Sequence, residues 1–217
     1  DRRVDALILW PSFAVAYYTH FRELYERRVP VAVIDHQQSE EQFADSIETD
    51  EKRSAASVVR HLHSLGHRRI ACMSSRETEW QSWAVVRRQC FELAAAKLDF
   101  TDVAVRRLNP HGTNGLEVAR ELLAHQPRPT AVFAVTDHEA LHLYAAAEEL
   151  GLSVPEDVSI VGVADLDFAA ALHPPLTTVR QQGREIGRRA AELVVDRLGG
   201  SLGSSPPQTI RVGAELI

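Results

Sequence analysis

Two hydrophobic periodicities alternate along this chain. Continuous apolar runs are typical of strands buried on both faces of a sheet, and they occupy residues 4–10, 31–35, 69–73, 103–107, 130–135 and 158–163. The stretches between them place apolar residues on one face of a helix, and we predict helices at residues 12–28, 50–65, 83–97, 115–125, 137–150 and 183–198. This alternation indicates right-handed βαβ units and a mostly parallel sheet.

Polar and turn-forming residues mark where these elements begin and end. Asp50 and Asp137 are placed to cap helices. Residues 36–46 are polar and rich in glutamine, which indicates a surface loop. Residues 199–207 form a Gly/Ser/Pro linker that precedes a last short strand at residues 208–212.

Ligands bind to parallel α/β sheets beyond the carboxyl ends of the strands. Applied to the predicted strands, this rule selects the polar side chains that follow an apolar run: Ser12, Asp35, Ser74, Ser75, Asp137 and Asp165. Hydroxyls and carboxylates at such positions can bind a polar ligand, but an aspartate there can equally form a turn or cap a helix. The pattern alone leaves both roles open.

Length, charge and cysteine content narrow the function. A chain of 217 residues forms one or two domains. Its net charge of −6 argues against contact with a phosphate backbone, so if the whole protein binds DNA, another part does so. No apolar segment is long enough to span a bilayer, and the first residues are typical of a strand rather than of a signal peptide. The two cysteines, Cys72 and Cys90, form no disulfide framework, which fits a reducing cytoplasm.

Five motifs follow one another in a specific order: LGHRRIA (65–71), PTAVFAVTDHEA (129–140), GLSVPEDVSIVGV (151–163), PPLTTV (174–179) and GREIGRRAAELV (183–194). In this order and spacing they resemble the effector-binding core of LacI/GalR-family transcription regulators. Residues 4–11 and 29–35 are similar to earlier strands of that family, so the resemblance covers almost the whole chain. It implies an α/β fold of the type I periplasmic binding proteins, with two Rossmann-like lobes that each contain a parallel sheet.

The resemblance also divides the chain between these lobes. Chains of this family cross between the lobes three times, which here falls near residues 49–50, 181–182 and 203–206. The lobes would then comprise residues 1–49 plus 182–203 (N-terminal lobe) and residues 50–181 plus 204–217 (C-terminal lobe). Family members carry a DNA-binding headpiece and further N-lobe strands ahead of the first strand found here, so the N-terminal lobe lacks its first strands. We expect a fragment, or a lobe completed by a partner or a swapped segment.

Matching the family's motifs residue by residue adds candidate ligand contacts. In the family, an arginine in the pattern R-x-x-G-F-x-x-A contacts the effector; Arg87 holds this position, with Cys90 in place of the glycine. A guanidinium suits hydroxyl pairs or a carboxylate, although Arg87 could also be a helix-surface residue. Thr136 and Asp137 occupy the family's N-D step. Asp35 ends its strand where family members often contact sugars, and it could also be a turn aspartate.

The family's G-[FY]-D-D step is altered here, because Ala164 stands where the first aspartate is expected and Asp165 holds the second position. In sugar-binding members the first aspartate often accepts hydrogen bonds from hydroxyls, so an ordinary sugar effector is less expected, unless Asp165 or Asp167 compensates. Trp83 could stack on a sugar or base ring, or pack in the core or a lid. Ser12 completes the set of candidate effector contacts.

A competing motif lies on one of the predicted helices. His138, Glu139 and His142 spell H-E-x-x-H, in which two imidazoles on one helix face bind zinc and the glutamate is the general base. The longer metzincin pattern fails, because Ala145 and Glu148 replace its glycine and third histidine. We therefore expect a polar helix face rather than a zinc hydrolase, and neither a metal nor a cofactor.

These observations predict the ligand-sensing core of a LacI/GalR-like transcription regulator, without catalytic activity. The resemblance implies that a small effector, a sugar or another polar metabolite, binds between the lobes. It also implies that a headpiece outside this chain binds DNA, and that the protein is a cytoplasmic homodimer without membrane contact. The alternative is a solute-binding receptor of a transporter, which has the same fold.

Overall fold

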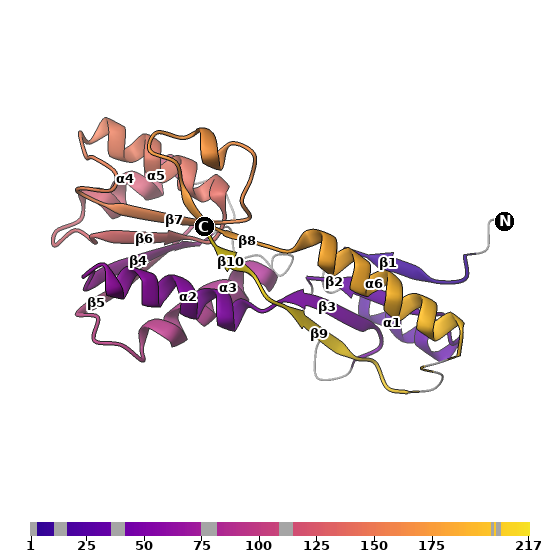
Figure 1. Ribbon diagram of the computed structural model, residues 1–217. Helices are drawn as coiled ribbons and strands as arrows, with labels where there is room; N and C mark the ends of the chain where they lie inside the picture. Colours follow the sequence, from indigo (N-terminus) through magenta and orange to yellow (C-terminus); the bar gives the residue numbers. More distant parts are fainter. Residues whose placement is uncertain are drawn as a thin grey trace. The chain divides into compact units, whose positions relative to one another are not determined.

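The chain divides into two compact units in the computed structural model (Figure 1). Unit 1 comprises Asp1–Asp50, Glu79–Trp83 and Gln182–Gly213, and unit 2 comprises Glu51–Thr78, Ala84–Gln181 and Ala214–Ile217. The residues that the structure describes are 4–10, 17–35, 42–74, 82–108, 115–200, 202 and 205–217, without the side chains of 17–19 and 82. Each unit is an α/β layer structure with a mainly parallel sheet.

Unit 1 contains a parallel sheet in the order β1-β2-β3-β9. Its strands are β1 (Leu7–Leu9), β2 (Val31–Ile34), β3 (Asp45–Thr49) and β9 (Thr209–Val212). Successive side chains of β2 point to opposite faces. Val31 and Val33 therefore pack with Phe21 of α1 (Tyr17–Glu26), whereas Ala32 packs with Ile186 of α6 (Gly183–Leu198).

Strand β1 is at an edge of this sheet. Val4, Ile8 and Trp10 are 62%, 44% and 72% exposed. These exposed apolar side chains lie on or next to the edge strand β1.

Unit 2 contains a larger sheet in the order β10-β8-β7-β6-β4-β5, parallel except for β10. Its strands are β4 (Arg69–Ser74), β5 (Asp102–Arg107), β6 (Ala131–Ala134), β7 (Ser159–Val163), β8 (Thr177–Arg180) and β10 (Glu215–Leu216). Its helices are α2 (Glu51–Ser64), α3 (Ser82–Ala95), α4 (Gly115–Ala124), α5 (Asp137–Glu149) and the short 3-10 helix η1 (Ala169–Ala171).

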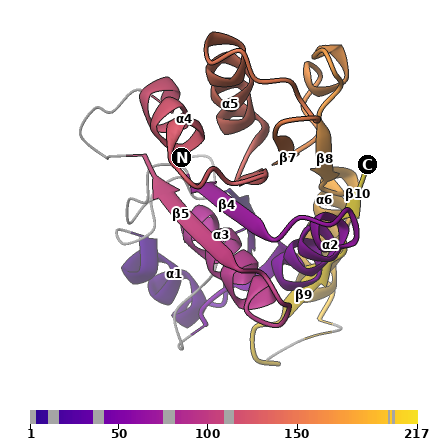
Figure 2. The same ribbon diagram turned by 90° about the vertical axis from the view of Figure 1, so that its left-hand side faces the viewer.

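The helices of unit 2 cover both faces of its sheet (Figures 1 and 2). Ala71 and Met73 of β4 belong to the core beneath α4 and α5. On the other face, the Phe133 ring of β6 stacks on Phe91 of α3, with ring centroids 4.9 Å apart. This arrangement confirms the predicted α/β fold with parallel sheets.

No helix in the described part of the chain combines the length and apolar composition of a membrane span.

Strand β3 overlaps the surface loop predicted at residues 36–46, so that prediction is wrong from Asp45 onward. Every residue of β3 is buried although most are polar. Two of its carboxylates are satisfied by cations from other elements: Asp45 pairs with Arg197 of α6 at 2.8 Å, and Glu48 pairs with Arg211 of β9 at 3.0 Å. Because ion pairs allow the polar residues of β3 to be buried, the sequence of this strand has no apolar run that would indicate it.

The third crossing between the units also differs from the prediction. The chain leaves unit 1 between Gly213 and Ala214, and not near residues 203–206. The reason is strand pairing: β9 joins β3 in unit 1, with Ile210 opposite Ile47, and only β10 reaches the unit 2 sheet, where it pairs antiparallel to β8. Residues 205–213 therefore belong to unit 1.

Candidate ligand-binding site

Arg87 lies on α3 and is buried, with 4% of its surface exposed. Its Nε and Nη2 atoms donate hydrogen bonds to the carboxylate of Glu51, and the Nη2–Oε1 distance is 2.6 Å. Its Nη1 donates to the carbonyl oxygen of Val135, directly after β6, over 2.6 Å. The alternative of a helix-surface arginine is therefore wrong. The fold holds this guanidinium at the carboxyl end of the unit 2 sheet.

Glu51, the partner of Arg87, is the first residue of α2 and of unit 2. Its side chain is 13% exposed. Burial of two charges costs desolvation, which only a well-bonded pair offsets, and the fork-like geometry of arginine supplies such bonds. Sequence reasoning missed Glu51, because no local pattern links two positions that lie 36 residues apart.

Thr136 is the N-cap of α5, so the prediction that Asp137 caps this helix is wrong by one residue. Thr136 has an extended backbone (φ −143°, ψ 166°), and its hydroxyl accepts a hydrogen bond from the backbone N–H of His138 at 3.2 Å. The same hydroxyl donates to the carboxylate of Glu139. This Thr-x-x-Glu arrangement is typical of a helix start.

The carboxylate of Asp137 turns inward and is wholly buried. Its Oδ1 accepts a hydrogen bond from the hydroxyl of Thr178 on β8 at 2.6 Å, and its Oδ2 accepts one from the backbone N–H of Leu166 at 2.8 Å. A Cβ atom at Gly162 of β7 would lie 2.2 Å from Oδ1, so only glycine permits this approach. Asp137 therefore ties α5 to β8 and to the loop after β7.

That loop begins with a strained turn. Ala164 and Asp165 have φ values of 123° and 55°, a region that non-glycine residues seldom occupy and that is enriched at ligand sites. The Asp165 carboxylate accepts a hydrogen bond from Nε of Arg180 at 2.6 Å, and this bond raises the pKa of Arg180. The Asp165 side chain is 25% exposed. Solvent therefore reaches the Asp165 side chain, and its contact with a ligand stays a prediction.

Asp35 takes the corresponding place in unit 1, directly after β2. It has a left-handed backbone (φ 46°), which aspartate tolerates better than most residues. Its Oδ1 accepts hydrogen bonds from the backbone N–H and the hydroxyl of Thr49, at 2.8 and 3.1 Å. Within the described residues, Oδ2 has no hydrogen-bond partner. The turn role is thus present, and one carboxylate oxygen remains available for a ligand.

The other predicted contacts are less informative. Ser12 and Ser75 lie outside the described residues. Ser74, at the end of β4, is wholly buried. Trp83 is half-buried near the start of α3. A ligand contact by Trp83 stays a prediction.

The residues of the H-E-x-x-H motif make contacts that stabilise the fold. The Glu139 carboxylate accepts a hydrogen bond from the hydroxyl of Thr136, the N-cap of α5. The ring of His138 packs edge-on against Phe168 at 5.6 Å, whereas the ring of His142 lies against the backbone of Gly115, where a Cβ would be 2.2 Å away. Among the described residues, no three His, Cys, Asp or Glu side chains are grouped to hold a metal ion. Each member of the motif thus has a packing or capping role.

At the carboxyl end of the unit 2 sheet, the fold brings together a set of fixed donors and acceptors: Glu51, Arg87, Thr136, Asp165 and Arg180. Such a set can recognise hydroxyl or carboxylate groups through charge-assisted hydrogen bonds. Sequence reasoning found three of these residues and missed Glu51 and Arg180. Arg180 directly follows the PPLTTV motif, which signalled the strand but not the ion pair.

Comparisons with known proteins agree with this architecture. Residues 59–217 match the family model of the periplasmic binding protein-like domain. A LacI-family transcriptional regulator from Enterococcus faecium, solved with bound ribose, is 28% identical, with a TM-score of 0.81 over 99% of this chain and 78% of its own. A LacI-family regulatory protein from Chloroflexus aggregans is 27% identical, with a TM-score of 0.80 over 99% of this chain and 75% of its own.

Curated relatives include two repressors. The HTH-type transcriptional repressor PurR of Vibrio atlanticus is 28% identical over 91% of this chain, and the HTH-type transcriptional repressor CytR of Escherichia coli is 31% identical over 81% of it. The chain spans 59% of the first relative's length and 51% of the second's. The aligned region is therefore one part of a longer protein in these relatives.

Proposed function

We propose that this chain, which belongs to the periplasmic binding protein-like domain family, is the ligand-sensing core of a LacI-type transcription regulator. The observation that carries the proposal is the fold match, over 99% of the chain, to a LacI-family regulator solved with ribose. The curated relatives named above are repressors, which favours a regulator over a solute-binding receptor of the same fold. In the whole protein, a headpiece outside this chain binds DNA, and two copies form a homodimer in the cytoplasm.

The effector is a small polar molecule that binds at the carboxyl ends of the parallel strands. Arg87 is its principal contact, because Glu51 and the Val135 carbonyl fix the guanidinium there. A fixed fork loses little conformational entropy when it binds hydroxyl pairs or a carboxylate. The further contacts are Thr136, Asp165, Asp35, Trp83 and Ser12. Asp137 is not among them, because its carboxylate is wholly buried and accepts hydrogen bonds from Thr178 and Leu166 within the fold.

The effector acts by shifting an equilibrium and is not transformed. A ligand changes the balance between two states only by its difference in affinity for them, and such couplings typically amount to about 1–3 kcal/mol. In the intact regulator this difference changes operator affinity. Catalysis is not required, and the effector leaves the protein unchanged.

A thermal-shift screen of the 217-residue chain tests the proposal. The panel contains ribose, other sugars, nucleosides and small carboxylates. A ligand present at about one hundred times its Kd stabilises the native state by about 2.7 kcal/mol, which raises the melting temperature by several degrees. Each hit is then recovered and identified by mass spectrometry. No hit in any class, or a hit recovered as a converted product, would contradict the proposal.

A further inference from the structure

A groove of about 400 Å3 lies on unit 2 between α2 and α3. These helices cover the sheet face opposite to α4 and α5 (Figure 2). Whereas α4 and α5 close over a shared core, α2 and α3 leave space between them. Val59 and Cys90 line the groove and are nearly inaccessible, and Leu93 stands 63% exposed beside them. Ala56, Ala94 and Leu98 complete its apolar lining.

Three exposed cations surround this apolar lining: Lys52 and Arg60 on α2, and Lys97 just beyond α3. None of them forms an ion pair with an acidic group in the part of the chain that the structure describes. Lys52 and Lys97 are also the only lysines in a sequence that contains 24 lysines and arginines. The groove is therefore positive although the whole chain carries a net charge of −6.

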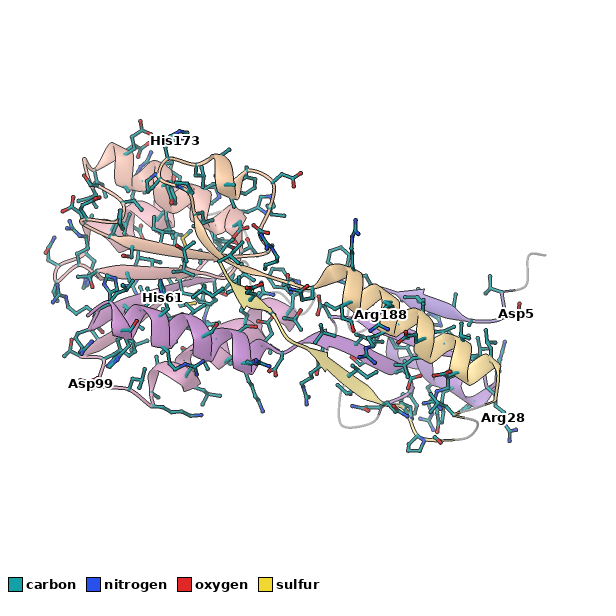
Figure 3. All side chains as sticks on the ribbon, viewed as in Figure 1. Asp5, Arg28, His61, Asp99, His173 and Arg188 are labelled. Atoms are coloured by element: carbon teal, nitrogen blue, oxygen red, sulfur yellow. The ribbon has the colours of Figure 1, made fainter. Side chains whose placement is uncertain are left out.

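The acidic side chains of the two helices are engaged by other cations. Glu51 pairs with Arg87, and Glu92 pairs with Arg88 one turn away. Asp99, which is labelled in Figure 3, pairs with His63 of α2 and with Arg68. Among the residues that the structure describes, the fold therefore supplies no counter-charge to the cations of the groove.

The spacing of the cations indicates the size of the partner. Lys52 and Arg60 are eight residues apart on one helix, which separates their backbone positions by about 12 Å at 1.5 Å per residue. A single small carboxylate does not reach both, whereas successive acidic side chains of a peptide do. A nucleic acid also carries spaced charges, but its phosphates offer no apolar groups to cover Leu93 and Ala94.

We propose that the α2/α3 groove docks an acidic amphipathic peptide segment of a partner protein. Apolar side chains of that segment fill the space beside Leu93, in the manner of a helix laid into a groove. Its aspartates or glutamates pair with Lys52, Arg60 and Lys97, which orients the segment and speeds its association. This surface is separate from the proposed effector site, and the inference does not depend on the effector.

The test uses a synthetic amphipathic helix as probe, with leucines at i and i+4 flanked by glutamates. The control peptide has lysine in place of each glutamate. Acetylation of Lys52 and Lys97 in the full chain is followed by mass spectrometry with and without peptide, and the N-terminal amine serves as an internal reference. The acidic probe is expected to slow acetylation of both lysines about tenfold at low salt, and less at high salt because exposed charges are screened.

Groove variants locate the binding. Leu93→Gln and Lys97→Gln are each expected to weaken binding of the acidic probe about tenfold, whereas Leu150→Gln, an exposed leucine that does not line the groove, leaves it unchanged. Circular dichroism confirms that each variant is folded. Equal protection by the basic peptide, binding that the groove variants do not change, or no protection by the acidic probe would overturn the proposal. Protection by duplex DNA instead of the acidic peptide would overturn it as well.

Discussion

Asp137 and Asp35 both follow a buried parallel strand, yet the fold engages them to different extents. Asp137 is wholly buried, and hydrogen bonds from Thr178 and Leu166 occupy its two carboxylate oxygens. Asp35 is only partly buried, and Thr49 occupies one oxygen. The first aspartate joins three elements of unit 2, and the second closes a single turn of unit 1.

A carboxylate at the end of a strand is therefore not by itself a ligand contact. Whether it can contact a ligand depends on how deeply the fold buries the carboxylate and how many hydrogen-bond partners the fold supplies to its oxygens. A wholly buried carboxylate lies out of reach of a ligand, and its exposure would leave the Thr178 and Leu166 donors of the fold unsatisfied. Position along the strand, which is all that a sequence shows, is the same for both residues.

Replacement of Asp137 should have the largest effect. In Asp137→Ala, the Thr178 hydroxyl and the Leu166 N–H lose their acceptor in a buried site, and each orphaned group costs about 1–3 kcal/mol. We expect the free energy of unfolding, measured with urea, to fall by about 3 kcal/mol. Asp137→Asn keeps one acceptor oxygen and should lose less. A loss below about 1 kcal/mol in the alanine variant would contradict the structural role.

The same network can be strained without touching its polar groups. In Gly162→Ala, the added Cβ atom would lie only 2.2 Å from Oδ1 of Asp137. Overpacking of this kind costs about 1–3 kcal/mol of stability. Gly187→Ala on α6 is the matched control, because its Cβ would meet nothing within 4 Å and alanine favours a helix by about 1 kcal/mol. Opposite signs for the two variants in urea unfolding are expected; equal effects would refute the close approach at Gly162.

Asp35 should matter less for stability and more for binding. Asp35→Asn keeps an acceptor for Thr49 and tolerates the left-handed backbone. Its free energy of unfolding should therefore change by less than about 0.5 kcal/mol. If the second carboxylate oxygen contacts the effector, the same variant should lower effector affinity about tenfold in calorimetry. Unchanged affinity would remove Asp35 from the proposed contacts.

The smallest effect is expected at the amino ends of the unit 2 strands, where His67 bridges Thr130 and Ser159 at 2.9 and 3.0 Å. Burial lowers the pKa of His67 below its ordinary value of 6.5, and the nearby His61 lowers it further. The unfolded chain then binds this proton more readily, so stability is full above pH 6.5 and declines as the pH falls below it. Urea unfolding as a function of pH measures the decline. His67→Ala should flatten it, and an unchanged pH dependence would exclude His67 as its source.

Much of the fold could be predicted because its strands are continuous apolar runs, and each apolar helix face has one regular spacing. Strand β3 escaped prediction because its polar side chains are buried by ion pairs, one of them between Asp45 and Arg197, which lie 152 residues apart. The third crossing was misplaced for a related reason: β9 is assigned by its pairing with β3, and that pairing has no local signal.

The candidate site was predicted unevenly. The motif pattern predicted Arg87, and the position at the end of a strand predicted Asp35 and Asp165. Neither pattern indicated which carboxylates are buried and hydrogen-bonded within the fold. The partner of Arg87, Glu51, appears in no local pattern, because the pairing joins the start of one helix to the middle of another. Long-range pairing of polar groups is therefore what the sequence conceals.

Calorimetric titration with the effector found in the thermal-shift screen measures whether the Arg87 guanidinium holds the ligand. The wild-type chain is compared with Arg87→Lys, which keeps a positive charge beside Glu51 but lacks the fork, and with Arg120→Ala, which breaks an exposed ion pair with Glu149. We predict that Arg87→Lys weakens binding at least about tenfold, that Arg120→Ala has no effect, and that all three proteins remain folded. Equal affinity of the Arg87→Lys variant and the wild type would show that the Arg87 guanidinium is not the principal effector contact.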